Sequence, residues 1–308
     1  MALYSLENNI LKEISENPFK LERPLQELCE MNLEKIFGLN YVKSEFSIHN
    51  FRLDTLAFDE ELKAFVIIEY KRDKNFSVID QGYAYLSVML NNKADFILEY
   101  NENCNKSLKK ADVDWSQSKI IFVSQGFTNY QKQSINFKDL PIELWEIKKY
   151  SKEIISLEQI QTMKNSESIN IISKNTEEID IVKKEIKVYT EEEHLKNSND
   201  EIKELYDKIK YMILNFDNEI KIKFTKLYTA FYINQRNIVD LCFMKNSIKI
   251  WINLKKGEIE DFKGILKDVS SVGHWGNGDY EIRIENDDEI DYIISLIKQS
   301  YKKQTQNI

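Results

Sequence analysis

The chain has 308 residues, of which 42% are hydrophobic and 12% aromatic, so it is long enough for two domains with substantial cores. Glycine occurs 8 times, and neither a P-loop nor a G-x-G-x-x-G pattern is present, which excludes the common nucleotide-binding folds. The net charge of −8 is divided between both halves of the chain. No large basic surface is therefore expected to drive nucleic-acid binding.

The cysteines and histidines lie too far apart in the sequence for any zinc-binding spacing. They are Cys29, Cys104, Cys242, His49, His194 and His274. A bound metal is therefore expected to have oxygen ligands. The sequence also contains no apolar run of about 18 residues and no leader-like segment, so we expect neither a membrane span nor secretion. A cytoplasmic protein with reduced thiols is the resulting expectation.

The first part of the chain predicts a compact α/β domain over residues 1–158. Its expected elements in chain order are a helix over Pro24–Phe37 that ends at Gly38, strands over 42–49, 52–58 and 64–70, a helix over 77–91, and strands over 95–99 and 119–124. The run 64–68 is apolar on both faces, which is typical of a strand inside a sheet that is covered on both sides.

Residues 159–198 are rich in Lys, Glu, Asn, Ser and Thr and are interpreted as a polar connector. A second, small α+β domain is predicted over 199–308. It begins with a helix capped at Ser198 by a box that includes Glu201, because the S-x-x-E spacing satisfies two helix N–H groups. Its later expected elements are strands over 238–244, 248–254 and 280–284, and a closing helix with acidic residues at its start.

The glycine-rich segment 273–278 is the most concentrated loop signal in the second domain. A flexible hairpin connection is the favoured interpretation of this segment. A loop that contacts a ligand is the alternative.

One group of residues has the pattern of an active site. Asp54 lies in one predicted strand, and the next strand ends with Glu69, Tyr70 and Lys71 after its buried run. Because positions i and i+2 of a strand share a face, Glu69 and Lys71 continue the face of the apolar residues before them. Such charges are costly to bury unless they pair with each other or bind a metal.

This arrangement resembles the PD-(D/E)XK nuclease superfamily, although Leu53 stands where that name has proline. In the following helix Gln81 and Tyr85 are four residues apart, which is similar to the Q-x-x-x-Y element of the RecB-like branch. Glu30, at the border of the first helix's buried stripe, matches a metal-facing glutamate of many members. Together these motifs resemble a group of uncharacterised two-domain prokaryotic proteins, some of which are labelled predicted transport proteins.

The resemblance implies a restriction-endonuclease-like mixed sheet flanked by helices, and a nuclease that binds Mg²⁺, with Mn²⁺ as an alternative. The implied metal ligands are Glu30, Asp54, Glu69 and the main-chain carbonyl of Tyr70. Lys71 would act on the attacking water. The implied supporting residues are Gln81 and Tyr85.

The expected partner is nucleic acid, with DNA favoured, and the second domain would select the substrate or form a homodimer. Three functional alternatives stay open. A module on the same fold could bind nucleic acid without cleaving it. Transport is the weakest alternative, because no membrane span is present. The third alternative is that these residues have no functional role. Asp54 would then be a solvated carboxylate, Glu69 and Lys71 would form a surface ion pair, and Glu30 would lie on a solvated helix face.

Overall fold

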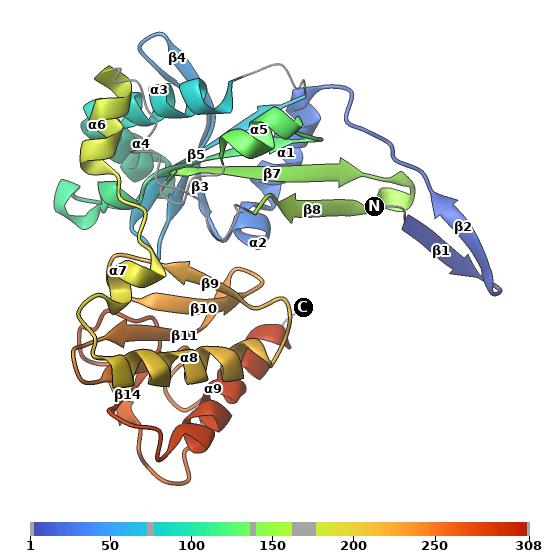
Figure 1. Cartoon of the computed structure of the whole chain (residues 1–308). Helices are drawn as coiled ribbons and strands as arrows, with labels where there is room; N and C mark the ends of the chain where they lie inside the picture. The colour runs from blue at the N-terminus through green and yellow to red at the C-terminus, as the bar shows by residue number, and fades with distance from the viewer. Residues whose placement is uncertain (1–2, 73–76, 136–139, 162–176, 307–308) are drawn as a thin grey trace. The chain divides into compact units, whose positions relative to one another are not determined.

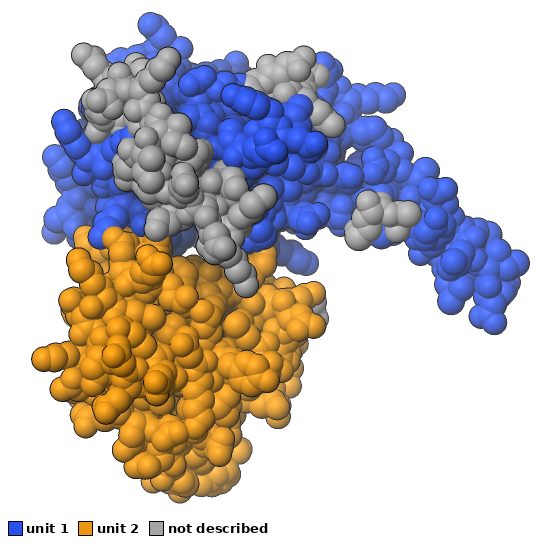
Figure 2. Space-filling model, viewed as in Figure 1, with its two compact units in different colours: residues 1–188 blue, residues 189–308 orange. Residues whose placement is uncertain are grey.

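The computed structural model describes residues 3–72, 77–135, 140–161 and 177–306. The chain forms two compact units, Met1–Val188 and Tyr189–Ile308 (Figure 1; Figure 2). Each unit has its own hydrophobic core. The boundary between the units lies inside the segment that the sequence predicts to be a polar connector.

The first unit is built around a six-stranded mixed sheet. Its elements are β1 (Leu3–Glu7), β2 (Ile10–Ile14), α1 (Glu22–Met31), α2 (Leu33–Phe37), β3 (Asn40–Ile48), β4 (Phe51–Asp59), β5 (Ala64–Lys71), α3 (Val78–Asn91), α4 (Lys93–Cys104), β6 (Lys119–Ser124), α5 (Asn129–Ser134), β7 (Ile142–Lys149), β8 (Ile155–Gln159) and α6 (Glu177–Glu185). The strand order of the sheet is β3-β4-β5-β6-β7-β8. The central pairs β5–β6 and β6–β7 are parallel, whereas the other pairs are antiparallel.

Alternating residues of β5 enter two separate cores on the two faces of this sheet. Phe65 and Ile67 pack in the core that contains residues of α3 and α4. Val66 and Ile68 pack in the core that contains residues of α1 and α2. The unbroken apolar run of β5 is explained by this burial on both sides, as the sequence predicts.

Strands β1 and β2 form a separate two-stranded hairpin, which projects from the rest of the first unit (Figure 1). Asn8 and Asn9 form its two-residue turn with φ of 51° and 63°. Positive φ at both turn residues matches a type I′ turn, which suits the twist of a tight hairpin. The base of the hairpin is held by backbone hydrogen bonds from Asn17 N to Lys149 O and from Ser151 N to Ser15 O, both 2.8 Å.

The second unit combines helices with a six-stranded antiparallel sheet. Its elements are α7 (Glu191–Leu195), α8 (Asp200–Leu214), β9 (Lys221–Phe224), β10 (Thr229–Ile233), β11 (Arg236–Phe243), β12 (Ile248–Ile252), β13 (Lys267–Asp268), β14 (Tyr280–Ile284) and α9 (Ile290–Thr305). The strand order is β13-β14-β12-β11-β10-β9. Ile248, Ile250, Ile252 and Leu254 share one core with apolar residues of α8 and α9, as their alternation predicts.

The glycine-rich segment 273–278 is held against the sheet of the second unit. The carboxylate of Asp240, which is completely buried, accepts hydrogen bonds from the main-chain N (2.7 Å) and the side-chain amide (3.0 Å) of Asn277. A Cβ at Gly278 would lie 1.9 Å from the main-chain oxygen of Ile252. Only glycine fits so close to the backbone at this point.

Three expected elements differ from the structure. The predicted strand over 95–99 is wrong, because these residues lie in α4, where Phe96 and Tyr100 are buried four residues apart and Leu98 is exposed. The first predicted helix is two helices, α1 and α2, that meet at Asn32. The cap of α8 is Asn199, whose side chain accepts from Ile202 N, and not Ser198.

The predicted connector contains helices as well. Residues 162–176 lie outside the described part of the chain. Beyond them, α6 places Val182 in the core that contains α3, and α7 begins after a capping box at Thr190. The structure therefore assigns α6 to the first unit.

The expected fold class is confirmed in its architecture: a mixed sheet flanked by helices, followed by a smaller domain of helices and an antiparallel sheet. Within the described residues, no helix combines the length and apolar character that a membrane crossing requires.

Candidate active site

Strand β5 carries Glu69 at the end of its buried run. Glu69 is 3% exposed and follows Ile67 on the face that packs against α3. Its neighbours in the parallel strand β6 are also buried, with Phe122 paired to Glu69 in the register of the two strands. A carboxylate at this depth requires hydrogen bonds or a positive charge to offset its lost hydration.

Asp54 of β4 lies beside Glu69. Its Oδ2 accepts a hydrogen bond of 2.9 Å from the main-chain N–H of Tyr70, the residue that follows Glu69. This bond attaches the Asp54 carboxylate to the end of β5. The two predicted carboxylates are thus brought together by the antiparallel pairing of β4 with β5.

Three side chains surround one oxygen of Glu69. Lys71 Nζ donates to Glu69 Oε1 at 2.8 Å, Gln81 Nε2 at 3.1 Å and the Tyr85 hydroxyl at 3.3 Å. Gln81 also donates to the Tyr85 hydroxyl at 2.9 Å. The i, i+4 spacing of Gln81 and Tyr85 places both side chains on one face of α3, as the sequence predicts, and the packing of α3 brings that face to Glu69.

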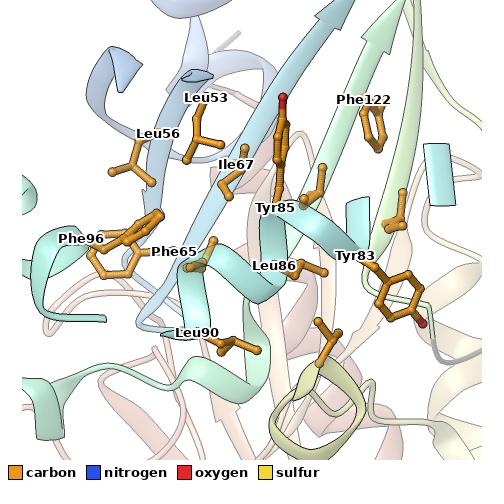
Figure 3. Packing of buried hydrophobic residues seen from close by; sticks show 14 of the residues in the cluster. Leu53, Leu56, Phe65, Ile67, Tyr83, Tyr85, Leu86, Leu90, Phe96 and Phe122 are labelled. Carbon is orange, nitrogen blue, oxygen red and sulfur yellow. The ribbon is translucent and has the colours of Figure 1, made fainter. Parts of the chain in front are cut away.

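Helix α3 holds Tyr85 at the border between the core and the site. In Figure 3 the Tyr85 ring stands beside Ile67, and its hydroxyl points away from Leu86 and Leu90. Burial, with the nearby Glu69 charge as the next cause, raises the pKa of Tyr85 to about 12. The hydroxyl therefore stays protonated at neutral pH and can donate to Glu69.

The electrostatics of the two carboxylates follow from burial and proximity. Burial first, and then the charge of Glu69, raise the pKa of Asp54 to about 6, although the Tyr70 N–H and Lys71 act in the opposite direction. Burial also raises the pKa of Glu69, against the effect of Lys71. Both carboxylates would be stabilised by an additional positive charge.

One atom of Glu69 indicates where such a charge fits. Its Oε2 is buried, and no donor in the described part of the chain lies within hydrogen-bonding distance of it. Buried carboxylate oxygens normally have a hydrogen-bond donor or a cation as partner. Carboxylate oxygens are also the ligands that Mg²⁺ prefers. The residues present therefore fit a divalent cation beside Glu69 and Asp54.

The structure does not bring Glu30 to this pair. Glu30 Oε1 accepts hydrogen bonds from Thr55 Oγ1 (2.6 Å) and Gln26 Nε2 (3.0 Å). Because Thr55 follows Asp54 in β4, its side chain points to the opposite face of the sheet. Across the described ranges, no group of three or more His, Cys, Asp or Glu side chains is arranged to hold a metal ion.

The acidic residue of α1 that does reach the site is Glu22, which the sequence analysis did not select. Glu22 Oε1 accepts a 2.9 Å hydrogen bond from the main-chain N of Arg72, directly after Lys71. Its charge is also among the causes that raise the pKa of Asp54. Its position in the first turn of a helix is common for acidic residues, so the sequence alone offers no signal that separates it from Glu30.

Comparison with known proteins relates the whole chain to one relative. The chain is 51% identical over 302 residues to an uncharacterized protein of Haemophilus influenzae (strain ATCC 51907 / DSM 11121 / KW20 / Rd). The match covers 98% of this chain and 100% of the relative. Residues 191–304 match a domain of unknown function, DUF5655, which lies within the second unit.

Two solved structures show a distant similarity. A repair endonuclease from Pyrococcus abyssi is 16% identical, with 39% of this chain and 45% of that chain covered, at a TM-score of 0.22. A structure of an EndoMS-dsDNA2 complex is 15% identical, with 44% of this chain and 60% of that chain covered, also at a TM-score of 0.22. The chain therefore spans only about half the length of these structures, and at such a TM-score the similarity carries no functional argument.

Proposed function

This chain belongs to the same family as the Haemophilus influenzae protein described above, and we propose that it is a metal-dependent nuclease that hydrolyses phosphodiester bonds, with DNA as the substrate. The observation that carries the proposal is the convergence of Asp54, Glu69 and Lys71 at the end of β5. A purely structural ion pair between Glu69 and Lys71 would have no need of a second, partly buried carboxylate beside it.

Asp54, Glu69 and the main-chain carbonyl of Tyr70 are the proposed ligands of Mg²⁺, with Mn²⁺ as a substitute. A bound cation would supply a Lewis acid that polarises the phosphate and lowers the pKa of the attacking water. Glu30 remains the sequence-predicted third acid. Its hydrogen bonds to Thr55 and Gln26 hold it away from the other two carboxylates, so it is not among the proposed ligands.

Lys71 is the proposed catalytic cation. Its ammonium group is held 2.8 Å from Glu69 Oε1, and its side chain is 21% exposed, so it is oriented by the carboxylate and still reaches solvent. From this position it can orient a water molecule toward a phosphate and stabilise the negative charge that develops during attack. Gln81 and Tyr85 fix the rotamer of Glu69, because both donate hydrogen bonds to Glu69 Oε1, the oxygen that also accepts from Lys71.

The proposal is tested by incubating the full chain with end-labelled single-stranded and double-stranded DNA and RNA, with Mg²⁺, with Mn²⁺ or with EDTA. We expect metal-dependent cleavage, which Lys71→Ala lowers by at least about 100-fold, while substrate affinity changes much less because the lysine acts mainly in the transition state. Lys35→Ala, at an exposed position of α2, is the matched control and should cleave normally.

Two results would contradict the nuclease proposal. Cleavage by Lys71→Ala at the wild-type rate would remove Lys71 from the mechanism. Binding of DNA by the wild-type chain without cleavage under any metal condition would favour the alternative, a nucleic-acid-binding module that does not cut.

A further inference from the structure

The β1–β2 hairpin exposes four large apolar side chains to solvent. The exposed fractions are 52% for Tyr4, 67% for Leu6, 63% for Ile10 and 64% for Leu11. Figure 2 shows that the hairpin projects from the rest of the first unit. A two-stranded hairpin alone is at best marginally stable in water, so these side chains are suited to a contact with another molecule.

In this two-stranded sheet each strand has an outer edge, and one of the two edges belongs to β1. The register of the hairpin pairs Glu7 with Ile10 across a two-residue turn, so Leu3, Ser5 and Glu7 are the residues that exchange hydrogen bonds with β2. The backbone groups of Tyr4 and Leu6 consequently point outward. Within the described residues this sheet has only these two strands, so the outward backbone groups of Tyr4 and Leu6 can pair with a third strand.

We propose that β1 pairs with β1 of a second copy of the chain, antiparallel, so that two hairpins form one four-stranded sheet. The register that pairs all five residues of the strand places Ser5 opposite Ser5 of the second copy. Tyr4 then faces Leu6 of the second copy, and both have outward backbone groups that can exchange hydrogen bonds. Such a contact is self-complementary, as a two-fold dimer requires.

The side chains favour dimerisation through the edge of β1 over dimerisation through the edge of β2. In β1 the described residues before Glu7 are uncharged, so the paired strands bring no like charges together at their centre. On β2 the equivalent symmetric pairing would place Lys12 directly against Lys12 of the second copy, which is unfavourable. On β1 the pairing adds Tyr4–Leu6 contacts on the face that also carries Leu11.

The proposed contact through β1 lies in the first unit, whereas the sequence suggests self-association through the second domain. It also does not depend on the nuclease proposal, because its residues lie on a separate projecting arm. The oligomeric state of the full chain can therefore be tested without a substrate or a metal.

Sedimentation velocity of the full chain at several concentrations provides the first test. We expect a dimer for the wild-type chain and for the control Leu98→Lys, which changes a similarly exposed leucine of α4. Leu6→Lys should weaken the dimer at least about tenfold, because the leucine that faces Tyr4 is lost from both symmetry-related Tyr4–Leu6 pairs of the interface. Circular dichroism should show that all three proteins are folded.

Cysteine cross-linking tests the register. Ser5→Cys should form an intermolecular disulfide under mild oxidation, because directly opposed residues of a non-hydrogen-bonded antiparallel pair have Cβ atoms about 4.5–5.5 Å apart. Ser47→Cys, at an exposed position of the edge strand β3, and the wild-type chain are the controls and should remain uncross-linked. A monomeric wild type, a dimer that survives Leu6→Lys unchanged, or a dimer that Ser5→Cys fails to cross-link would each overturn the proposal.

Discussion

Replacing Asp54 by asparagine separates a buried metal site from a solvated surface carboxylate without any need for a substrate. Asparagine keeps an oxygen that can accept the hydrogen bond from Tyr70 N–H, now 2.9 Å long, but it removes the charge beside Glu69. The change therefore tests the repulsion between the two carboxylates with little loss of packing.

The magnitude follows from the pKa of Asp54, which burial and Glu69 raise from 3.8 to about 6. Because the folded state holds this proton more tightly than the unfolded state, the stabilisation by protonated Asp54 is complete below pH 3.8 and is lost as the pH rises through about 6. The wild-type chain thus loses up to about 3 kcal/mol of unfolding free energy above that range. About half of this loss is expected at pH 5.

The assay is chemical denaturation and thermal melting in EDTA at pH 5 and pH 8. Asp54→Asn should be more stable than the wild type at pH 8, and its advantage should shrink by about 1–2 kcal/mol at pH 5. Addition of Mg²⁺ at pH 8 should raise the melting temperature of the wild type by mass action and raise that of the variant much less.

Glu34→Gln, at an exposed position of α2, is the control, because removing a single exposed charge usually changes stability by less than about 0.5 kcal/mol. If wild type and Asp54→Asn respond in the same way to pH, EDTA and Mg²⁺, Asp54 is an ordinary solvated carboxylate. The converging-carboxylate site would then be refuted, together with the nuclease proposal.

Three further predictions concern other parts of the molecule. Tyr85→Phe removes the hydroxyl that donates to the Glu69 carboxylate, and it should weaken Mg²⁺ binding, measured by calorimetry, by about tenfold while leaving the fold intact. Unchanged affinity would show that the hydroxyl does not position a ligand. Residues 1–188 and 189–308, expressed separately, should each unfold cooperatively, and an unfolded product from either would contradict the division into two units. Asp240→Ala should lower the unfolding free energy of the second unit by about 2 kcal/mol or more in urea titrations, because it leaves the amide donors of Asn237, Asn253 and Asn277 without their buried acceptor. An unchanged unfolding free energy would show that these hydrogen bonds contribute nothing to stability.

Local sequence patterns correctly predicted an element where it is long, or where its apolar residues form an unbroken run or follow one clear period. β5 has an unbroken apolar run and is buried on both faces, and the predicted helix over 77–91 is α3, in which Tyr83, Leu86 and Leu90 are buried at helical spacing. The run Asp95–Glu99 was too short to distinguish helix from strand, because three consecutive apolar residues fit both. Only the burial of Phe96 together with Tyr100 identifies the helix.

The hairpin at the start of the chain had a usable signal that the sequence analysis did not consider. Asn8 and Asn9 are both residues that tolerate positive φ, and apolar residues flank them on either side. Its exposure could not be predicted, because whether a strand pairs with the main sheet or projects from it depends on contacts far away in the sequence.

The sequence by itself determined which residues of one strand and one helix could act together. Glu69 and Lys71 share a face because a strand has a period of two, and Gln81 and Tyr85 share a face because a helix has a period of about 3.6. Tertiary structure alone decided that these two pairs meet at one carboxylate oxygen, and that Glu22 rather than Glu30 reaches the end of β5. The reason is that periodicity specifies the face of an element, whereas the point at which a helix crosses a sheet is set by packing between distant segments.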